Sequence, residues 1–217
     1  MSYRGKVWIS AAVASAIFWL VLVLALLINA AIAAGIPPEA ARYRLPLTQT
    51  VQAYCGLGCP VADFAAQIHQ ESRYRSDAVS PVGARGMAQF MPATSKWISG
   101  VYPGQLGANK PADPQWAMRA LVLYDRWLWD RTRAADDCNH LAKVKSAYNG
   151  GLGWVYKSEK IAKSSGLDAA RWWGNIETVN DGRTPAALRE NHDYPRLILT
   201  VYAPMYAAAG WGRRACA

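Results

Sequence analysis

IHQESRYRSDAVSPVGARGMAQFMPAT, residues 68–94, is the part of the chain from which its fold can best be inferred. A predicted helix from Pro60 to about Arg73 leads into it, since proline suits a first helical turn that does not need its N–H. Apolar side chains recur along this helix at the helical period, and Glu71 follows Ile68 by three residues, so its carboxyl lies on or beside the apolar face. Burial there disfavours the charged form and raises the pKa, as a general acid requires near neutral pH. The simpler alternative is an ordinary helix-end salt bridge.

The segment after this helix predicts a loop that returns toward the carboxyl. Ser80-Pro81 and two glycines break the helix, and Pro92 starts another helical turn. Glu71-Ser72 together with residues 78–94 resembles the catalytic block of the family 1 (Slt-type) lytic transglycosylases, lysozyme-like enzymes that cleave peptidoglycan. Where that family usually has Gly-Leu-Met-Gln, this chain has Gly-Met-Ala-Gln at residues 86–89.

Two further blocks carry the same resemblance. Residues 147–151, AYNGG, match the family's Ala-Tyr-Asn-(Gly/Ala)-Gly motif, and residues 190–194, ENHDY, resemble its Glu-Thr-x-x-Tyr block with Asn191 in place of Thr. Taken alone, the first block is also typical of a glycine helix end, and a tyrosine such as Tyr194 is also typical of a core. The resemblance implies that Glu71 and Tyr194 are catalytic. It implies substrate-binding roles for Ser72, Met87, Gln89, Phe90, Tyr148 and Asn149.

The resemblance also implies a reaction, cleavage of the MurNAc–GlcNAc β-1,4 bond that leaves a 1,6-anhydro-MurNAc end. No second acid falls at a paired position in the motifs, and we interpret Asp63 and Asp77 as helix-end or surface residues, so a single carboxyl suits this route better than hydrolysis. A hydrolytic lysozyme on the same fold is the alternative, and a module that binds peptidoglycan without cleaving it is a third; intact Glu71 and Tyr194 favour an enzyme.

No cofactor and no metal are expected. The histidines at positions 69, 140 and 192 have no ligand spacing with one another. Six tryptophans could stack on sugar faces, although a core position is the simpler interpretation of most of them: Trp97, Trp116, Trp127, Trp154, Trp172 and Trp173.

Composition and charge indicate an anionic partner. The 217 residues carry 24 Lys and Arg against 15 Asp and Glu, a formal net charge of +9. The basic residues are scattered and form no nucleic-acid motif, so we expect no nucleic-acid partner. Peptidoglycan, with carboxylates on its stem peptides, and a membrane surface both suit this charge.

The N-terminus predicts export. Val7–Ala34 has no charged residue and is long enough to cross a bilayer, and Arg4 and Lys6 precede it. We therefore predict a signal-anchor over residues 1–34 that holds the chain in the inner membrane facing the periplasm. A cleaved signal peptide with the A-x-A site at residues 31–33 is the alternative and would release the chain to the periplasm.

The chain as a whole predicts a mainly α-helical, lysozyme-like domain over residues 53–217, joined to the anchor by a linker over residues 35–52. Further predicted helices are 114–133 with Asp113 as N-cap, 141–148, 168–173 and 195–206. A phage-type signal-anchor endolysin and a wall-opening component of a secretion or conjugation machine are both compatible with this organisation.

Four cysteines in an exported domain predict disulfides, and three pairings are possible. The glycines between Cys55 and Cys59 allow a tight local bridge, which leaves Cys138 to pair with Cys216. One bridge with free thiols is the alternative.

Overall fold

In the computed structural model, helix α3 (Val61–Ser72) forms the centre of the folded domain, and ten of its twelve residues are buried. Small and apolar residues form half of the helix, and buried hydrogen bonds hold its polar residues Gln67, His69 and Ser72. The helix ends after Ser72, since Arg73 and Tyr74 adopt left-handed backbone angles, with φ of 53° and 66°. The buried Tyr74 hydroxyl donates to the Ala65 carbonyl at 2.9 Å and so holds this turn against the helix.

The structure describes residues 17–23 and 35–216, and the chain divides into two compact units, 1–36 and 37–217. Residues 17–23 are helical, and most of the predicted anchor lies outside the described residues. None of the helices in the described ranges combines the length and the apolar character needed to cross a bilayer. The second unit comprises η1 (Pro38–Tyr43), α2 (Arg44–Cys55), α3, α4 (Pro92–Val101), α5 (Pro103–Leu106), α6 (Pro114–Trp129), α7 (Asp137–Gly150), α8 (Leu152–Ser164), η2 (Ile176–Thr178), α9 (Pro185–Arg196), the π-helix η3 (Leu197–Tyr202) and α10 (Ala203–Ala208).

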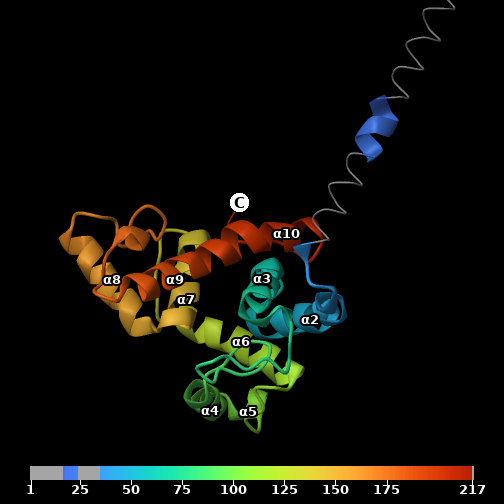
Figure 1. Ribbon diagram of the computed structural model, residues 1–217, viewed down its shortest axis with the longest axis horizontal. Helices are drawn as coiled ribbons and strands as arrows, with labels where there is room; N and C mark the ends of the chain where they lie inside the picture. The colour runs from blue at the N-terminus through green and yellow to red at the C-terminus, as the bar shows by residue number, and fades with distance from the viewer. Residues whose placement is uncertain (1–16, 24–34, 217) are drawn as a thin grey trace, which may run out of the picture. The chain divides into compact units, whose positions relative to one another are not determined.

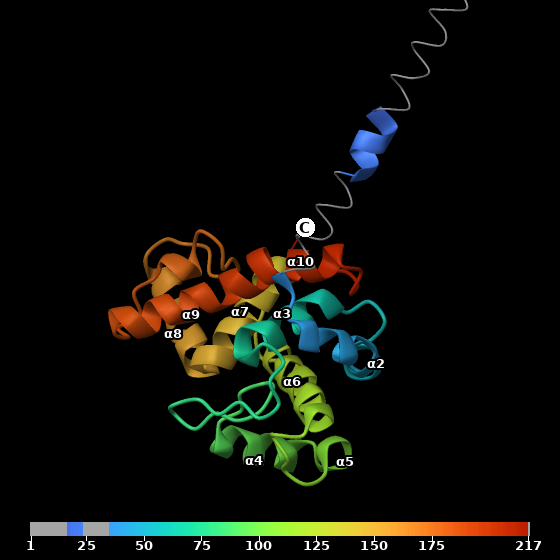
Figure 2. The ribbon, with the colours of Figure 1, turned by 45° about the vertical axis from the view of Figure 1, so that its right-hand side comes forward.

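Helix α3 lies between α2, α6 and α10 in the second unit (Figures 1 and 2). Helices α2, η3 and α10 pack directly on it, and α6 packs on α2 and α7. Helix α7 in turn packs on α8 and α9, while α4 and α5 contact α6 at the other end of the unit. Over the described residues the only β structure is two isolated bridges within the loop after α3, so the prediction of a mainly helical domain is confirmed.

Three predicted segments differ from the structure. Most of the expected linker, residues 35–52, forms η1 and α2, and Leu47 and Val51 of α2 are fully buried. Residues 168–173 form turns rather than a helix, because the Asn139 side chain accepts the backbone N–H groups of Trp172 and Trp173. The last long helix begins at Pro185 and not at Pro195, which lies inside α9 directly before the π-helix η3. A proline inside a helix removes a backbone hydrogen bond, and the wider turns of a π-helix can accommodate the proline ring.

Both predicted disulfides are formed. Cys55–Cys59 closes the short loop before α3, and Cys138–Cys216 ties the C-terminus to the first turn of α7. The first bridge ends two residues before α3 starts, so it restrains the chain just ahead of that helix.

Candidate functional site

Glu71 lies in the last turn of α3, at the floor of a cleft of about 290 Å³. The helix thus brings a carboxyl from the protein interior to the surface of the cleft, where a substrate can reach it. Three parts of the chain form the walls: the loop after α3, the start of α4, and the facing sides of α6, α7 and α9. The lining residues are Glu71, Ser80, Val82, Ala84, Gln89, Phe90, Met91, Thr94, Tyr124, Tyr148, Asn149 and Glu190.

Tyr194 and Glu71 come together although 123 positions separate them in the chain. The Tyr194 hydroxyl, carried by α9, donates a hydrogen bond to Oε1 of Glu71. Burial raises the pKa of Glu71 to about 8, opposed mainly by that hydrogen bond and helped by the charge of Asp125. Burial and the nearby Glu71 also raise the pKa of Tyr194 well above 10, so the tyrosine stays protonated. Glu71 can therefore hold a proton at neutral pH, which is what the sequence predicts for a general acid.

The loop after α3 forms one wall through its own hydrogen bonds. Gln89 has a left-handed backbone with φ of 48°, and its Nε2 donates to the carbonyls of Ala78 at 3.2 Å and Gly86 at 2.9 Å. Gly86 is required, since a Cβ there would lie 1.8 Å from the Pro111 carbonyl oxygen. Gln89 thus lines the cleft, but its amide N–H₂ is engaged in holding the loop closed.

Ser72 and Met87, predicted as substrate-binding residues, do not line the cleft. The Ser72 hydroxyl donates to the Met87 carbonyl at 2.8 Å and accepts from the Arg75 N–H at 3.1 Å, and both Ser72 and Met87 are buried. The pair fastens the end of α3 to the wall loop. Helical periodicity places a residue on a face, but the partner across that face depends on the returning loop.

The AYNGG block forms the opposite wall at the end of α7. The Tyr148 hydroxyl donates to the Ala88 carbonyl at 2.8 Å and so joins this wall to the loop. Asn191 of α9 donates through Nδ2 to Oδ1 of Asn149 at 2.9 Å, which orients the Asn149 amide in the cleft. Gly150 allows this close approach, because a Cβ there would lie 2.6 Å from Nδ2 of Asn191. Asn191, which stands where the motif usually has Thr, therefore orients the side chain of Asn149.

Glu190 and Tyr124 also line the cleft, although neither is among the site residues predicted from the sequence. Glu190 lies four residues before Tyr194 on α9, a spacing that puts both on one helix face and could have indicated it. It is exposed, and its charge raises the pKa of Glu71 further. Of the two acids considered from the sequence, Asp77 is exposed and outside the cleft lining, and Asp63 is fully buried rather than on the surface.

A buried ion pair links the helices beneath the cleft. The Lys145 Nζ of α7 donates to Oδ2 of Asp125 on α6 at 2.5 Å and to Oε1 of Gln67 on α3, and Lys145 and Gln67 are fully buried. Each residue is a close neighbour in sequence of one that lines the cleft: Gln67 of Glu71, Asp125 of Tyr124, and Lys145 of Tyr148. The network thus connects the three helices, α3, α6 and α7, that carry Glu71, Tyr124 and Tyr148.

The histidines serve packing in the described residues. His69 stacks on Tyr202 at 4.2 Å, His140 binds Thr132, and His192 lies against Trp172. No group of three or more His, Cys, Asp or Glu side chains suited to a metal ion occurs within residues 17–23 and 35–216.

Comparison with known proteins gives a consistent result. Residues 53–170 match the family Transglycosylase SLT domain. Membrane-bound lytic murein transglycosylase F of Pasteurella multocida is 31% identical over 112 residues, which cover 50% of this chain and 21% of the relative. The protein of that name from Shewanella pealeana is 27% identical over 130 residues, covering 59% and 26%. The chain thus spans only about a fifth to a quarter of the length of these relatives.

Two solved structures share the fold. The 70-kDa soluble lytic transglycosylase of Escherichia coli superposes with a TM-score of 0.51 at 22% identity, over 76% of this chain and 26% of that one. The complex of the 70-kDa soluble lytic transglycosylase with bulgecin A gives 0.54 at 21% identity, over 78% and 25%. Because the family match covers more than half of the 217 residues and includes Glu71, Tyr148 and Asn149, the chain belongs to the transglycosylase SLT domain family.

Proposed function

We propose that this chain is a peptidoglycan lytic transglycosylase that cleaves the β-1,4 bond between MurNAc and GlcNAc. The observation that carries the proposal is the carboxyl of Glu71, set at the floor of a cleft, hydrogen-bonded by Tyr194 and with its pKa raised to about 8. Membership of the transglycosylase SLT domain family and the names of its relatives support the same activity.

In this mechanism Glu71 first acts as acid and then as base. It donates its proton to the glycosidic O4 while the 2-acetamido oxygen of MurNAc attacks C1, so the C1–O4 bond breaks as the new C–O bond forms. The resulting Glu71 carboxylate accepts the proton of the C6 hydroxyl, whose oxygen attacks C1 and displaces the acetamido oxygen. The product is a 1,6-anhydro-MurNAc end, and Glu71 regains its proton without consuming water. Tyr194 holds the carboxyl in place throughout.

Hydrolysis is a second candidate, and Glu190 is the observation that favours it. A carboxylate that lines the same cleft as Glu71 could activate a water on the far side of the sugar. Glu190 also suits a role in positioning the substrate. Its side chain is exposed, and its Oε1 lies 3.5 Å from Nδ2 of Asn149, another residue of the cleft.

The test is mass spectrometry of muropeptides released from purified sacculi. Wild-type protein should release fragments with 1,6-anhydro ends, lighter by one water than reducing ends. Glu71→Gln keeps the size of the side chain but cannot transfer a proton, so turnover should fall about 10²- to 10⁴-fold. Tyr194→Phe should reduce it less, since it removes one hydrogen bond and no proton carrier.

Glu190→Gln separates the two candidates. Anhydro products at a rate within about tenfold of wild type are expected from a transglycosylase. Reducing ends from wild type, lost in Glu190→Gln, would establish hydrolysis with Glu190 as the base. Rapid digestion of sacculi by Glu71→Gln would contradict both mechanisms.

The proposal includes the site of action. The uncharged run from Val7 to Ala34 after two basic residues supports an uncleaved signal-anchor that tethers the domain in the periplasm, and relatives are named membrane-bound. Intact-mass analysis of the membrane fraction tests this, since a mature N-terminus near Ala34 would indicate a cleaved signal peptide. An anchored enzyme of this kind would suit a signal-anchor endolysin or local wall opening.

A further inference from the structure

A patch of aromatic side chains continues from the cleft along α4 and α6. Thr94 lines the cleft and lies one turn before Trp97 on α4, and Tyr124 lines it and lies one turn before Trp127 on α6. The ring centroids of Trp97 and Trp127 are 4.8 Å apart, and Trp97 lies 5.8 Å from Tyr124. Trp97 and Trp127, with Arg131 beside them, are called the α4–α6 patch below.

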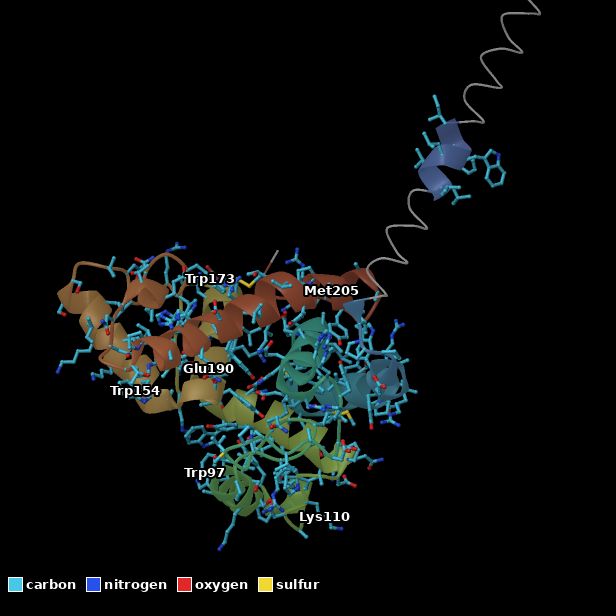
Figure 3. All side chains as sticks on the ribbon, viewed as in Figure 1. Trp97, Lys110, Trp154, Trp173, Glu190 and Met205 are labelled. Carbon is cyan, nitrogen blue, oxygen red and sulfur yellow. A yellow bond between two sulfur atoms is a disulfide. The ribbon has the colours of Figure 1, made fainter. Side chains whose placement is uncertain are left out.

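Helix packing does not account for the exposure of Trp97. Ser95 and Ile98 are the fully buried residues of α4, and α4 contacts α6. Trp97 is 40% exposed and lies at the outer surface of α4 (Figure 3). Leaving that much of an indole in water forgoes favourable burial, and an exposed aromatic next to a cleft is typical of a binding surface.

Arg131 gives the patch a fixed positive charge. Its guanidinium carbon lies 3.7 Å from the centroid of the Trp127 ring, and its Nη1 donates to the Trp127 carbonyl at 3.0 Å. The Tyr156 hydroxyl donates to the Arg131 carbonyl at 2.8 Å and so holds the backbone. No carboxylate in the described part of the chain forms an ion pair with Arg131, so its outward side can receive an anion.

Resting on the function proposed above, we propose that the α4–α6 patch is an additional saccharide subsite for a sugar of the same peptidoglycan strand, outside those held in the cleft. The C–H face of a pyranose is apolar and loses contact with water when it stacks on an indole. Three residues, a rise of about 4.5 Å, separate Trp97 from Thr94 and Trp127 from Tyr124, so the patch adjoins the lining of the cleft. Arg131 would pair with a carboxylate of the stem peptide, which its planar fork can bind through two hydrogen bonds.

The test compares long and short substrates with the full-length protein. Defined peptidoglycan fragments of four and eight sugars, with and without stem peptides, are the probes. Trp97→Ala should lower kcat/KM about tenfold for the eight-sugar fragments and leave the four-sugar fragments unchanged, while Trp97→Phe, which still offers a ring, should lose less. Arg131→Gln should lower kcat/KM only for eight-sugar fragments that carry stem peptides.

Leu57→Ala is the matched control. Leu57 is 85% exposed in the disulfide loop before α3, at the end of the helix opposite to Glu71, and the helix rises roughly 15 Å between Val61 and Glu71. Leu57→Ala should therefore change kcat/KM for neither fragment length. The ratio of rates on long and short fragments is measured within one variant, so partial misfolding of Trp97→Ala cancels from it. An equal loss on both lengths, or no loss on either, would overturn the subsite. Failure of the wild type to cleave any fragment would instead overturn the proposed function.

Discussion

Glu71 can hold a proton near neutral pH because of where α3 ends. The helix carries the residue out of the core to the floor of the cleft, and the left-handed Arg73 and Tyr74 stop the helix just after it. The side chain is therefore accessible from the cleft but surrounded by protein, and burial dominates its pKa. The hydrogen bond from Tyr194 acts in the opposite sense and fixes the position of the oxygen it binds.

The raised pKa predicts the dependence of activity on pH. In the proposed mechanism the acid form of Glu71 starts the reaction, so kcat/KM should fall about tenfold per pH unit above about 8. Glu190→Gln removes a negative charge that raises this pKa, and the basic limb should therefore shift to lower pH. Initial rates on soluble glycan fragments between pH 5 and 10 provide the measurement. A profile that stays flat to pH 10 would show that Glu71 is not the acid.

Asp63 predicts a pH dependence of stability. Burial raises its pKa from 3.8 to about 6, opposed chiefly by the Ala215 N–H, which donates to Oδ2 at 2.8 Å. Because the folded pKa lies above the unfolded one, the native state binds the proton more tightly. The stability gained from protonated Asp63 is thus present below about pH 4 and is lost as pH rises through 6.

Asp63→Asn isolates this contribution, since the amide oxygen can still accept from Ala215 and does not titrate. The difference in free energy of unfolding between the variant and wild type should change by about 2.5 kcal/mol from pH 4 to pH 7, in favour of the variant at the higher pH. Urea unfolding at unit steps of pH measures it. A difference that is independent of pH would contradict the assignment.

At the level of helices, the site depends on side chains that cross between α3, α6 and α7. Lys145, Asp125 and Gln67 form a buried network beneath the cleft, and burial raises the pKa of Asp125 while Lys145 lowers it. A buried charge that loses its partner is strongly destabilising, even where the intact pair contributes little net stability. The network also acts on Glu71, whose pKa Lys145 lowers.

Lys145→Met should therefore reduce the free energy of unfolding by about 3–5 kcal/mol, because Asp125 remains buried without its cation. Lys145→Met combined with Asp125→Leu should restore much of that loss, and denaturant titration of the singles and the double completes the cycle. Arg126→Met is the control, since the exposed Arg126–Asp130 pair should contribute less than about 1 kcal/mol. Additive losses in the double variant would show that the two residues are not coupled.

At the level of the folded domain, the C-terminus acts as a strap across the start of α3. The Ala62 N–H donates to the Arg213 carbonyl at 3.3 Å, and the Arg213 Nε donates to the Gly58 carbonyl at 2.5 Å. The Cys138–Cys216 disulfide then joins this strap to α7. The last residues of the chain thereby hold the beginning of the helix that carries Glu71 at its other end.

The two disulfides should differ in their effect on stability. Cys138–Cys216 closes a loop of 78 positions and Cys55–Cys59 one of 4. Loop-closure entropy assigns about 4.5 kcal/mol to the first and about 2 kcal/mol to the second. Cys138→Ser with Cys216→Ser should therefore lower the midpoint of thermal unfolding more than Cys55→Ser with Cys59→Ser. The reverse order would indicate that the strap is already fixed without its covalent bond.

Local sequence patterns predicted the parts of the site that lie close together in the chain. The bounds of α3, the Asp113 N-cap of α6 and the disulfide pairing follow from capping, periodicity and short spacings. The prediction of a linker failed at α2, whose buried Leu47 and Val51 follow prolines that are equally typical of an extended segment. The same patterns also left open which residues would face the cleft.

What the sequence alone determined is a helical domain of this family, with a carboxyl carried on an apolar helix face and motif residues around it. Only the tertiary structure decided that Tyr194 binds Glu71, that Ser72 turns away from the cleft, and that Glu190 joins it. Periodicity records which face of an element is apolar, whereas the partner across that face is set by how elements far apart in the chain pack. The desolvation that raises the pKa of Glu71 is likewise a property of that packing, because it depends on every group brought near the carboxyl.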